Sequence, residues 1–191
     1  MDPSQSKKIS ELGKMRGRHK TVLRSLRLSK SLDEAIQHEA VNRSVSVNSF
    51  AASILDKYFE WDILAEKFRF ITLPNEMLAS LIEALDDEKL AQLGRAAGSV
   101  IPKEVILFWF KTVDLETFVS YLAFHSKYLH TAEYKILREG KNVIITAHHQ
   151  LGDKWSVWLK SYLIEAVRVN LGVMPKAELS TKTVRLEFDI Q

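Results

Sequence analysis

The chain has 191 residues, of which 46% are hydrophobic, so it can form one or two domains with a proper core. It contains no cysteine, which excludes disulfides, thiolate catalysis and cysteine-based zinc sites. The first residues lack the apolar core of a signal peptide, and no apolar run approaches the ~20 residues of a membrane-spanning helix. The formal net charge of +3 hides an asymmetry, because residues 1–30 contain nine Lys or Arg and only two acidic residues.

Residues 1–20 form a basic arm without apolar periodicity. Its positive side chains include Lys14, Arg16, Arg18 and Lys20. Such a segment is expected to be disordered when free and to settle on nucleic-acid phosphates or in a minor groove. The simpler interpretation is a solubilising tail. The position of the arm directly before the next element favours DNA.

The segment after the arm predicts one short strand. Leu26 and Leu28 alternate with Ser25 and Arg27, so a period of two places the leucines on one face and the polar pair on the other. A lone strand cannot satisfy its backbone hydrogen bonds, and a second copy of the same strand is the simplest partner. The pattern therefore predicts a homodimer.

Two short helices are expected after this strand. Ser29 and Ser31 are candidate N-caps of the first helix, and Ser46 is a candidate N-cap of the second. No glycine or proline interrupts the second helix as far as Phe68, so a stiff connection to the rest of the chain is expected. Apolar residues at helical spacing mark the buried faces: Leu32, Ile36 and Ala40, then Phe50, Ile54, Leu55, Tyr58 and Phe59.

The strand SLRL (25–28), the first helix and the helix start SVNSF (46–50) resemble the ribbon-helix-helix DNA-binding family over residues 21–61. In that family, strands from two chains form a ribbon that enters the DNA major groove. The resemblance implies that Ser25 and Arg27 contact base edges, with Leu23 as a third position. It also implies that Asn48 and Ser49 bind a phosphate through their backbone amides at the helix start.

Arg24 departs from the pattern of this family, because that parity is usually apolar. It either frays the ribbon or turns outward to the DNA backbone, where the basic side chains of the arm are also expected. The simpler interpretation of Arg27 is a solvated surface charge. The order of strand and helices behind a basic arm favours the DNA interpretation.

Residues 62–191 predict a separate α/β domain. Phe70–Leu73 is expected to form a short strand, and Pro74 to open a helix. A further helix is expected from Asp114, which is its N-cap, through His125.

Between these elements another helix is expected from Asp86 through Ala97. Gly94 and Gly98 permit either a close helix approach or a stop. Pro102 is then expected to open a separate apolar segment, which includes the deeply buried run VILFWF (105–110).

In the last third of the chain the spacing of the apolar residues changes. Residues 133–137 and 143–148 predict a β-hairpin with Gly140 in its turn. A long amphipathic helix follows and is closed by Gly172. Residues 184–190 alternate apolar and charged side chains, which indicates a half-exposed strand.

The segments GDKWSVWLKSYL (152–163) and NLGVMP, before the last strand, carry a pattern-level resemblance to the heme–nitric-oxide-binding superfamily in its broad sense. This superfamily includes vinyl-reductase-type small-molecule-binding domains. The layout is also similar to archaeal proteins that fuse a ribbon-helix-helix to such a domain. The resemblance implies a ligand-sensing or dimerising module with a pocket between the helices and the sheet.

Trp155, Trp158 and His125 are the candidate pocket residues of this domain. The simpler interpretation is that the tryptophans pack the helix on the sheet and that His125 is a hydrogen-bonded core residue, not an axial heme ligand. His148 and His149 are adjacent in a strand, so they point to opposite faces and cannot easily share a metal. No cofactor and no metal are expected.

No phosphate loop, dinucleotide fingerprint, G-x-S-x-G or HExxH motif is present, so no enzymatic activity is expected. The predicted fold is α+β, with an N-terminal ribbon-helix-helix module and a C-terminal domain of helices on a small antiparallel sheet. The predicted function is a dimeric, sequence-specific transcriptional regulator in the cytoplasm, associated with the nucleoid. Its expected partners are double-stranded DNA, a second copy and a small effector, with no membrane.

Two alternatives stay open. One is a chromosome or partition protein that binds DNA without sequence preference. The other is a ligand-binding or enzymatic C-terminal domain that uses the N-terminal segment only to dimerise, in which case Arg27 is dispensable.

Overall fold

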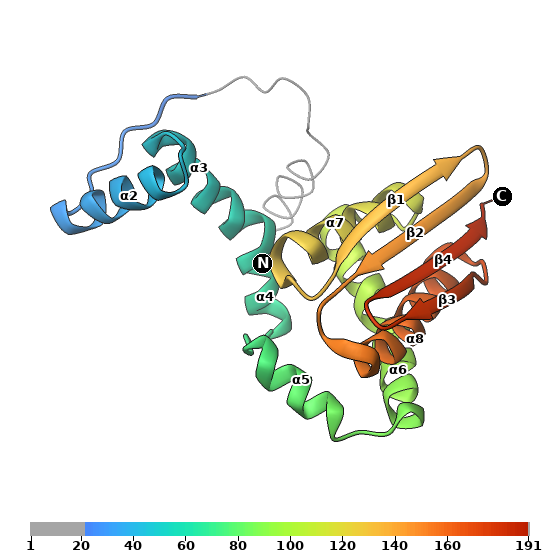
Figure 1. The fold of residues 1–191 in the computed structure, drawn as a ribbon. Helices are drawn as coiled ribbons and strands as arrows, with labels where there is room; N and C mark the ends of the chain where they lie inside the picture. The colour runs from blue at the N-terminus through green and yellow to red at the C-terminus, as the bar shows by residue number, and fades with distance from the viewer. Residues whose placement is uncertain (1–21, 191) are drawn as a thin grey trace. The chain divides into compact units, whose positions relative to one another are not determined.

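The computed structural model describes residues 22–190. The chain divides into two compact units, Met1–Phe70 and Ile71–Gln191, called unit 1 and unit 2 here (Figure 1). The sequence pattern placed the domain boundary after Trp61. The structure places Trp61 inside a helical run that continues to Phe68, so the division into units falls beyond that run.

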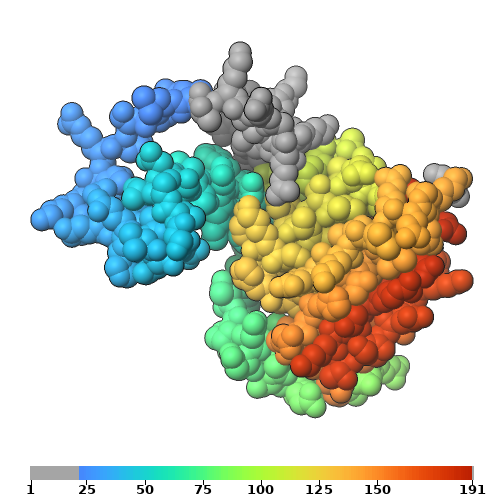
Figure 2. Space-filling model, turned by 45° about the horizontal axis from the view of Figure 1, so that its top comes forward, coloured from blue at the N-terminus to red at the C-terminus, as the bar shows by residue number. Residues whose placement is uncertain are grey.

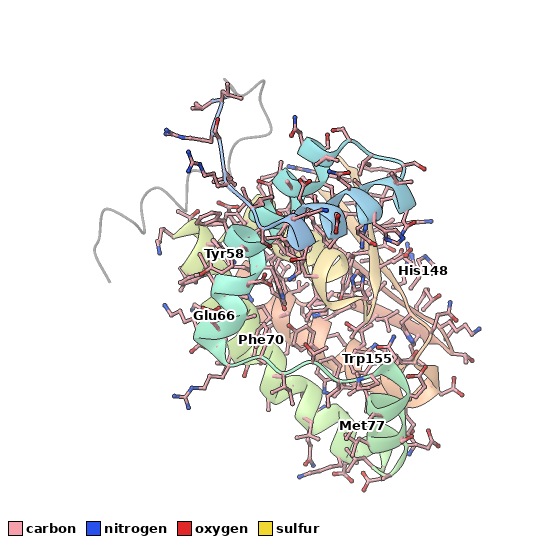
Figure 3. All side chains as sticks on the ribbon, turned by 90° about the vertical axis from the view of Figure 1, so that its left-hand side faces the viewer. Tyr58, Glu66, Phe70, Met77, His148 and Trp155 are labelled. Carbon is pink, nitrogen blue, oxygen red and sulfur yellow. The ribbon has the colours of Figure 1, made fainter. Side chains whose placement is uncertain are left out.

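Unit 1 is helical over most of its described length. Tyr58 and Glu66 lie along the continuous run made of α3, η1 and α4 (Figure 3). Arg69 ends this run in the left-handed conformation, with φ of 53°. The helices are α2 (Lys30–Asn42), α3 (Val47–Lys57), the π-helical turn η1 (Tyr58–Asp62) and α4 (Ile63–Phe68).

Local capping explains where the first two helices start. The side chain of Ser29 accepts a hydrogen bond from the amide of Leu32, and the side chain of Ser46 accepts one from the amide of Ser49. Both caps occupy donors that the first helical turn leaves without a backbone acceptor. Of the two serines considered for α2, Ser29 is the cap.

The expected strand Ser25–Leu28 is not formed in the single chain. Residues 22–29 lie outside any helix and pair with no other strand of residues 22–190. A strand exists only against a neighbouring strand that accepts and donates its backbone hydrogen bonds, and the described chain offers none at this position.

Unit 2 combines four helices with one sheet, which confirms the α+β class. The four strands are antiparallel throughout, in the order β1-β2-β4-β3. The helices are α5 (Asn75–Glu83), α6 (Asp87–Phe110), α7 (Leu115–Leu129) and α8 (Gly152–Leu171). The strands are β1 (Glu133–Glu139), β2 (Asn142–His148), β3 (Lys176–Ser180) and β4 (Thr183–Asp189).

Helices cover one face of this sheet. Helix α7 contacts β1, and α8 contacts β3 and β4. The opposite face belongs to the surface of unit 2, with β3 and β4 in red in the space-filling view (Figure 2). Every second residue of the two central strands is buried beneath the helices: Val143, Ile145, Ala147, Val184, Leu186 and Phe188.

Two expectations for residues 62–191 were wrong near prolines. Phe70–Leu73 forms no strand, because no other strand lies beside it in the described chain. Pro102 does not open a new segment but lies buried inside α6, which runs unbroken from Asp87 to Phe110. A proline within a helix costs one backbone hydrogen bond, and here the packing of the helix against α8 outweighs that local signal.

The sequence pattern also missed strand β3. Lys176–Ser180 is short and mostly exposed, and it gains its hydrogen bonds from β4 alone. The hairpin was predicted correctly, with Gly140 in the turn at φ of 62°, as was the end of α8 at Gly172. No helix among residues 22–190 is long and apolar enough to cross a membrane.

Candidate functional site

The segment before α2 presents a positive surface. Arg24 and Arg27 are exposed and have no acidic partner among the described residues. Lys30 lies 3.8 Å from Glu34 one turn along α2, and both side chains are well exposed. An exposed pair of this kind contributes little to stability. The two arginines are therefore available to an external anion.

The candidate base-contact residues are not buried by any other part of the described chain. Leu23 is 92% exposed, and Ser25 and Arg27 are exposed beside it. Leu26, on the opposite parity, is 71% exposed. Because neither face of the segment is buried, its conformation is not stabilised by the rest of the described chain.

The start of α3 has one of its two expected phosphate donors already occupied. The amide of Ser49 donates to the Oγ atom of Ser46 at 3.1 Å, and the Ser46 hydroxyl donates to Ser49 Oγ at 2.8 Å. The amides of Val47 and Asn48 have no acceptor among the described residues. A phosphate at this helix start would therefore meet the Asn48 amide, and it would have to compete with the cap for that of Ser49.

Arg43, in the turn between α2 and α3, contacts residues of both helices. Its Nε atom donates to Glu39 Oε1 at 2.7 Å, and its guanidinium lies 5.3 Å from the centre of the Phe50 ring. The hydrogen bond from Arg43 lowers the pKa of Glu39. One side chain thus links both helices, although the glutamate is accessible to water.

Four further candidate phosphate contacts lie outside the described residues. They are Lys14, Arg16, Arg18 and Lys20 of the basic arm.

In unit 2, His125 is buried among three tyrosines. Its Nδ1 atom lies 3.4 Å from the hydroxyl of Tyr134, and its ring lies 5.9 Å from that of Tyr121 and 6.4 Å from that of Tyr162. Burial lowers the pKa of His125 to about 4, so the imidazole is neutral at neutral pH. Burial also raises the pKa of each of the three tyrosine hydroxyls.

The hydroxyls of Tyr121 and Tyr162 hydrogen-bond to each other in this cluster. His125 was a candidate pocket residue from its sequence position, but none of the three tyrosines was. The i, i+4 spacing of Tyr121 and His125 on α7 was the available signal, but Tyr134 and Tyr162 come from β1 and α8. Only the fold brings them to the same place.

Trp155 and Trp158 stack on each other, with ring centres 4.5 Å apart, and Trp158 stacks on Tyr162 at 4.9 Å. The Nε1 atom of Trp155 is buried without a hydrogen-bond partner among the described residues. Neither of the two hollows of unit 2 that are described below is lined by the tryptophans or by His125. The two tryptophans therefore pack against each other, while His125 packs among the tyrosines.

His149 and Ser156 form a buried polar pair that could be mistaken for a catalytic dyad. The amide of Leu151 donates to His149 Nδ1 at 3.4 Å, so the proton of the neutral ring belongs on Nε2, which lies 2.8 Å from Ser156 Oγ. Ser156 in turn donates to the carbonyl oxygen of Ser180 at 2.7 Å. His149 therefore donates to the serine and does not act as its base, and burial lowers its pKa.

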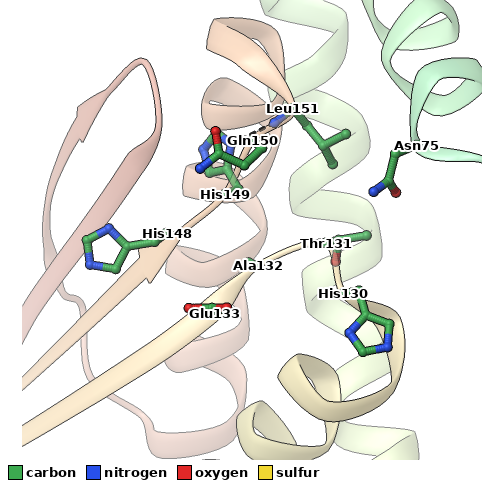
Figure 4. Close-up of a pocket in the computed structure, with 9 residues that line it drawn as sticks. All are labelled: Asn75, His130, Thr131, Ala132, Glu133, His148, His149, Gln150 and Leu151. Carbon is green, nitrogen blue, oxygen red and sulfur yellow. Dashed lines mark hydrogen bonds between the residues drawn. The ribbon is translucent and has the colours of Figure 1, made fainter. Parts of the chain in front are cut away.

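One hollow of about 220 Å³ lies where β1 begins and β2 ends (Figure 4). Three histidines and one glutamate line it, together with Asn75, Thr131, Ala132, Gln150 and Leu151. No group of three metal-ligating side chains within residues 22–190 is placed to hold a metal ion. A second hollow of about 440 Å³ lies beside the end of α8 and is lined in part by Asn170 and Ile190.

No family model matches the chain, and no curated protein sequence matches it significantly.

Proposed function

We propose that the protein is a sequence-specific DNA-binding transcriptional regulator that acts as a homodimer. In this proposal unit 1 is a ribbon-helix-helix module. Residues 25–28 of two chains pair as a two-stranded ribbon in the DNA major groove, where Arg27, Ser25 and Leu23 contact base edges. Unit 2 serves as a ligand-sensing or oligomerisation domain.

The observation that carries the proposal is the lack of burial in unit 1. Among residues 22–59, Ala40 alone is buried, and α3 buries none of its side chains. Large apolar residues in this range remain exposed: Leu26, Leu28, Leu32, Val41, Ile54, Leu55, Tyr58 and Phe59. So many exposed large apolar side chains in one small unit are typical of an interface with another chain.

A second copy of the same segment is the partner that explains both the unpaired strand and the exposed leucines. It would give residues 25–28 the strand partner that their alternating pattern requires, and it would cover Leu26 and Leu28. When the two strands pair, the leucines of both lie on one face of the ribbon. Ser25 and Arg27 then lie on the opposite, outward face. The outward face would then carry the groups that hydrogen-bond to base edges.

Charge supports DNA as the ligand of that face. Arg24 and Arg27 have no acidic partner among the described residues, and the chain before residue 31 carries nine basic and two acidic residues. Basic side chains that neutralise phosphates supply affinity that falls with salt, while contacts to base edges supply the choice of sequence. The Asn48 amide adds a neutral phosphate donor at the start of α3.

The test is binding of the purified full chain to a pool of genomic DNA fragments at several salt concentrations. Arg27→Ala is compared with Arg95→Ala, which removes an exposed arginine from α6 in unit 2. We expect the wild-type protein and Arg95→Ala to retain a few fragments at moderate salt. Arg27→Ala should lose this selectivity but keep weak, salt-sensitive binding.

Other outcomes separate the alternatives. Equal retention of all fragments by the wild-type protein would indicate a chromosome or partition protein without sequence preference. No binding above background would contradict the proposal and leave unit 1 as a dimerisation segment only.

A further inference from the structure

The hollow at the end of the β1–β2 hairpin is open to solvent and is bordered by two short connections. Three residues, His130–Ala132, connect α7 to β1, and three, His149–Leu151, connect β2 to α8 (Figure 4). The His149 amide donates to the carbonyl of Lys182 at 3.0 Å. Its ring is held by Leu151 and Ser156. This wall of the hollow is therefore formed before any ligand arrives.

Several polar groups that line the hollow have no partner among residues 22–190. The side chains of Asn75, His130, Glu133 and Gln150 make no hydrogen bond or ion pair with any described residue. The hydroxyl of Thr131 is shielded from solvent and also has no partner among them. The four side chains are exposed, so water occupies their hydrogen-bonding positions until a ligand replaces it.

The residues that line the hollow favour a positively charged ligand over an anion. Glu133 is the only residue in it with a formal charge at neutral pH when histidine is neutral, and no lysine or arginine lines the hollow. Oxygen acceptors come from the carboxylate of Glu133 and the side-chain amides of Asn75 and Gln150. An anion would meet a carboxylate here without a compensating cation.

A metal ion is not the fitting ligand. Both ring nitrogens of His149 already have hydrogen-bond partners, and His148 Nδ1 lies 3.2 Å from Thr183 Oγ1. No three metal-ligating side chains converge anywhere in residues 22–190. An alkylammonium group suits the lining better, because it carries one positive charge and three hydrogen-bond donors that need several oxygen acceptors.

We infer that this hollow is a binding site for a small organic amine in its ammonium form, with Glu133 as its charge partner and the side-chain amide oxygens of Asn75 and Gln150 as hydrogen-bond acceptors. The site belongs to unit 2 alone and does not depend on DNA binding by unit 1. The volume of about 220 Å³ admits a small molecule and not a peptide.

The test uses three probes of the same carbon chain on the full-length protein: propylammonium, 1-propanol and propionate, at matched ionic strength. Binding is followed by calorimetry and by amide NMR shifts. We expect saturable binding of propylammonium alone, with shifts confined to residues that line the hollow. Propionate or 1-propanol binding as well as the amine would overturn the inference.

Variants identify the charge partner. Glu133→Gln removes the charge and keeps the shape, and it should weaken propylammonium binding by about tenfold or more. Glu139→Gln is the matched control, because Glu139 is exposed at the other end of β1 and does not line the hollow.

Glu133 is an exposed surface residue, so unfolding curves of its variant should overlay those of the wild-type protein. Absence of saturable amine binding to the wild-type protein, or equal affinity in Glu133→Gln and the wild type, would refute the site.

Discussion

Gly98 of α6 lies directly against the backbone carbonyl of Tyr162 on α8, so close that a Cβ atom at position 98 would overlap the carbonyl oxygen. Gly94, one turn earlier, has the same relationship to the carbonyl of Trp158. The two glycines let the backbones of α6 and α8 approach each other, and these helices share the most extensive contact in unit 2. The close approach anticipated from the glycine spacing is thus confirmed, and the alternative of a helix stop is excluded.

Gly98→Ala should therefore destabilise unit 2. In an unobstructed helix this substitution stabilises by ~1 kcal/mol, because alanine has the higher helix propensity. Here the added methyl group meets a backbone oxygen that no rotamer change can move, and we expect a loss of about 1–3 kcal/mol. Urea unfolding measures the change. Gln92→Ala, at an exposed position of the same helix, is the control and should change stability little.

The hydroxyl pair of Tyr121 and Tyr162 should behave as a coupled unit. Removal of one hydroxyl leaves the other in the core with a lost partner, which costs about 1–3 kcal/mol. Removal of both leaves no unsatisfied group from this pair, so Tyr121→Phe/Tyr162→Phe should cost less than the sum of the single variants. A double-mutant cycle from denaturant unfolding tests this. Strictly additive effects would show that the hydrogen bond contributes nothing.

Stability should fall on acidification because of His125. The pKa of His125 is lowered from 6.5 to about 4 by burial, so the unfolded chain binds the proton more tightly than the folded one. The neutral folded form is favoured fully above the unfolded pKa, and this contribution is lost as pH falls from 6.5 towards 4. The expected loss is about 3 kcal/mol over that window.

His125→Gln should reduce the slope of unfolding free energy against pH in the same window. The slope should not vanish, because burial also lowers the pKa of His149, which therefore contributes with the same sign. Unfolding by urea at a series of pH values provides the measurement. An unchanged slope in the variant would contradict the burial of His125.

Self-association should depend on the apolar face of unit 1. Leu26 is 71% exposed in the single chain, and Leu26→Asp would place a charge on the apolar face of the proposed ribbon, which the dimer buries. We expect its dimer dissociation constant to rise about tenfold or more in sedimentation experiments. Met174→Asp is the matched control, because Met174 is 68% exposed in unit 2 and should leave the dimer intact.

The same experiment separates two properties of unit 1. If Leu26→Asp is monomeric and also fails to select DNA fragments, dimerisation and base contact depend on one ribbon. If it remains dimeric, the contact between copies lies elsewhere in the chain and the ribbon proposal fails.

Some features of the candidate sites were accessible from residue types alone. The sequence alone shows the basic residues before α2. It also shows that Leu26 and Leu28 alternate with polar neighbours. The occupation of the Ser49 amide by Ser46 is a matter of cap geometry, which residue type does not reveal. The polar hollow was not predicted, because its walls come from the ends of three elements that only the fold brings together.

The sequence by itself determined the features that depend on neighbours within about one helical turn or one strand. Ser29, Ser46 and Asp114 cap helices through amides three residues ahead, and the alternating residues of β2 and β4 face the core as their period predicts. These choices depend on backbone geometry that is the same in every protein.

Only the tertiary structure decided the features whose partners are distant in sequence. Pro102 stays within α6 because α8 packs against that helix, and β3 forms because β4 completes its hydrogen bonds. The cluster around His125 assembles residues from α7, β1 and α8. In each case the decisive free energy comes from burial and hydrogen bonds across the fold, and these outweigh the local preference of the chain.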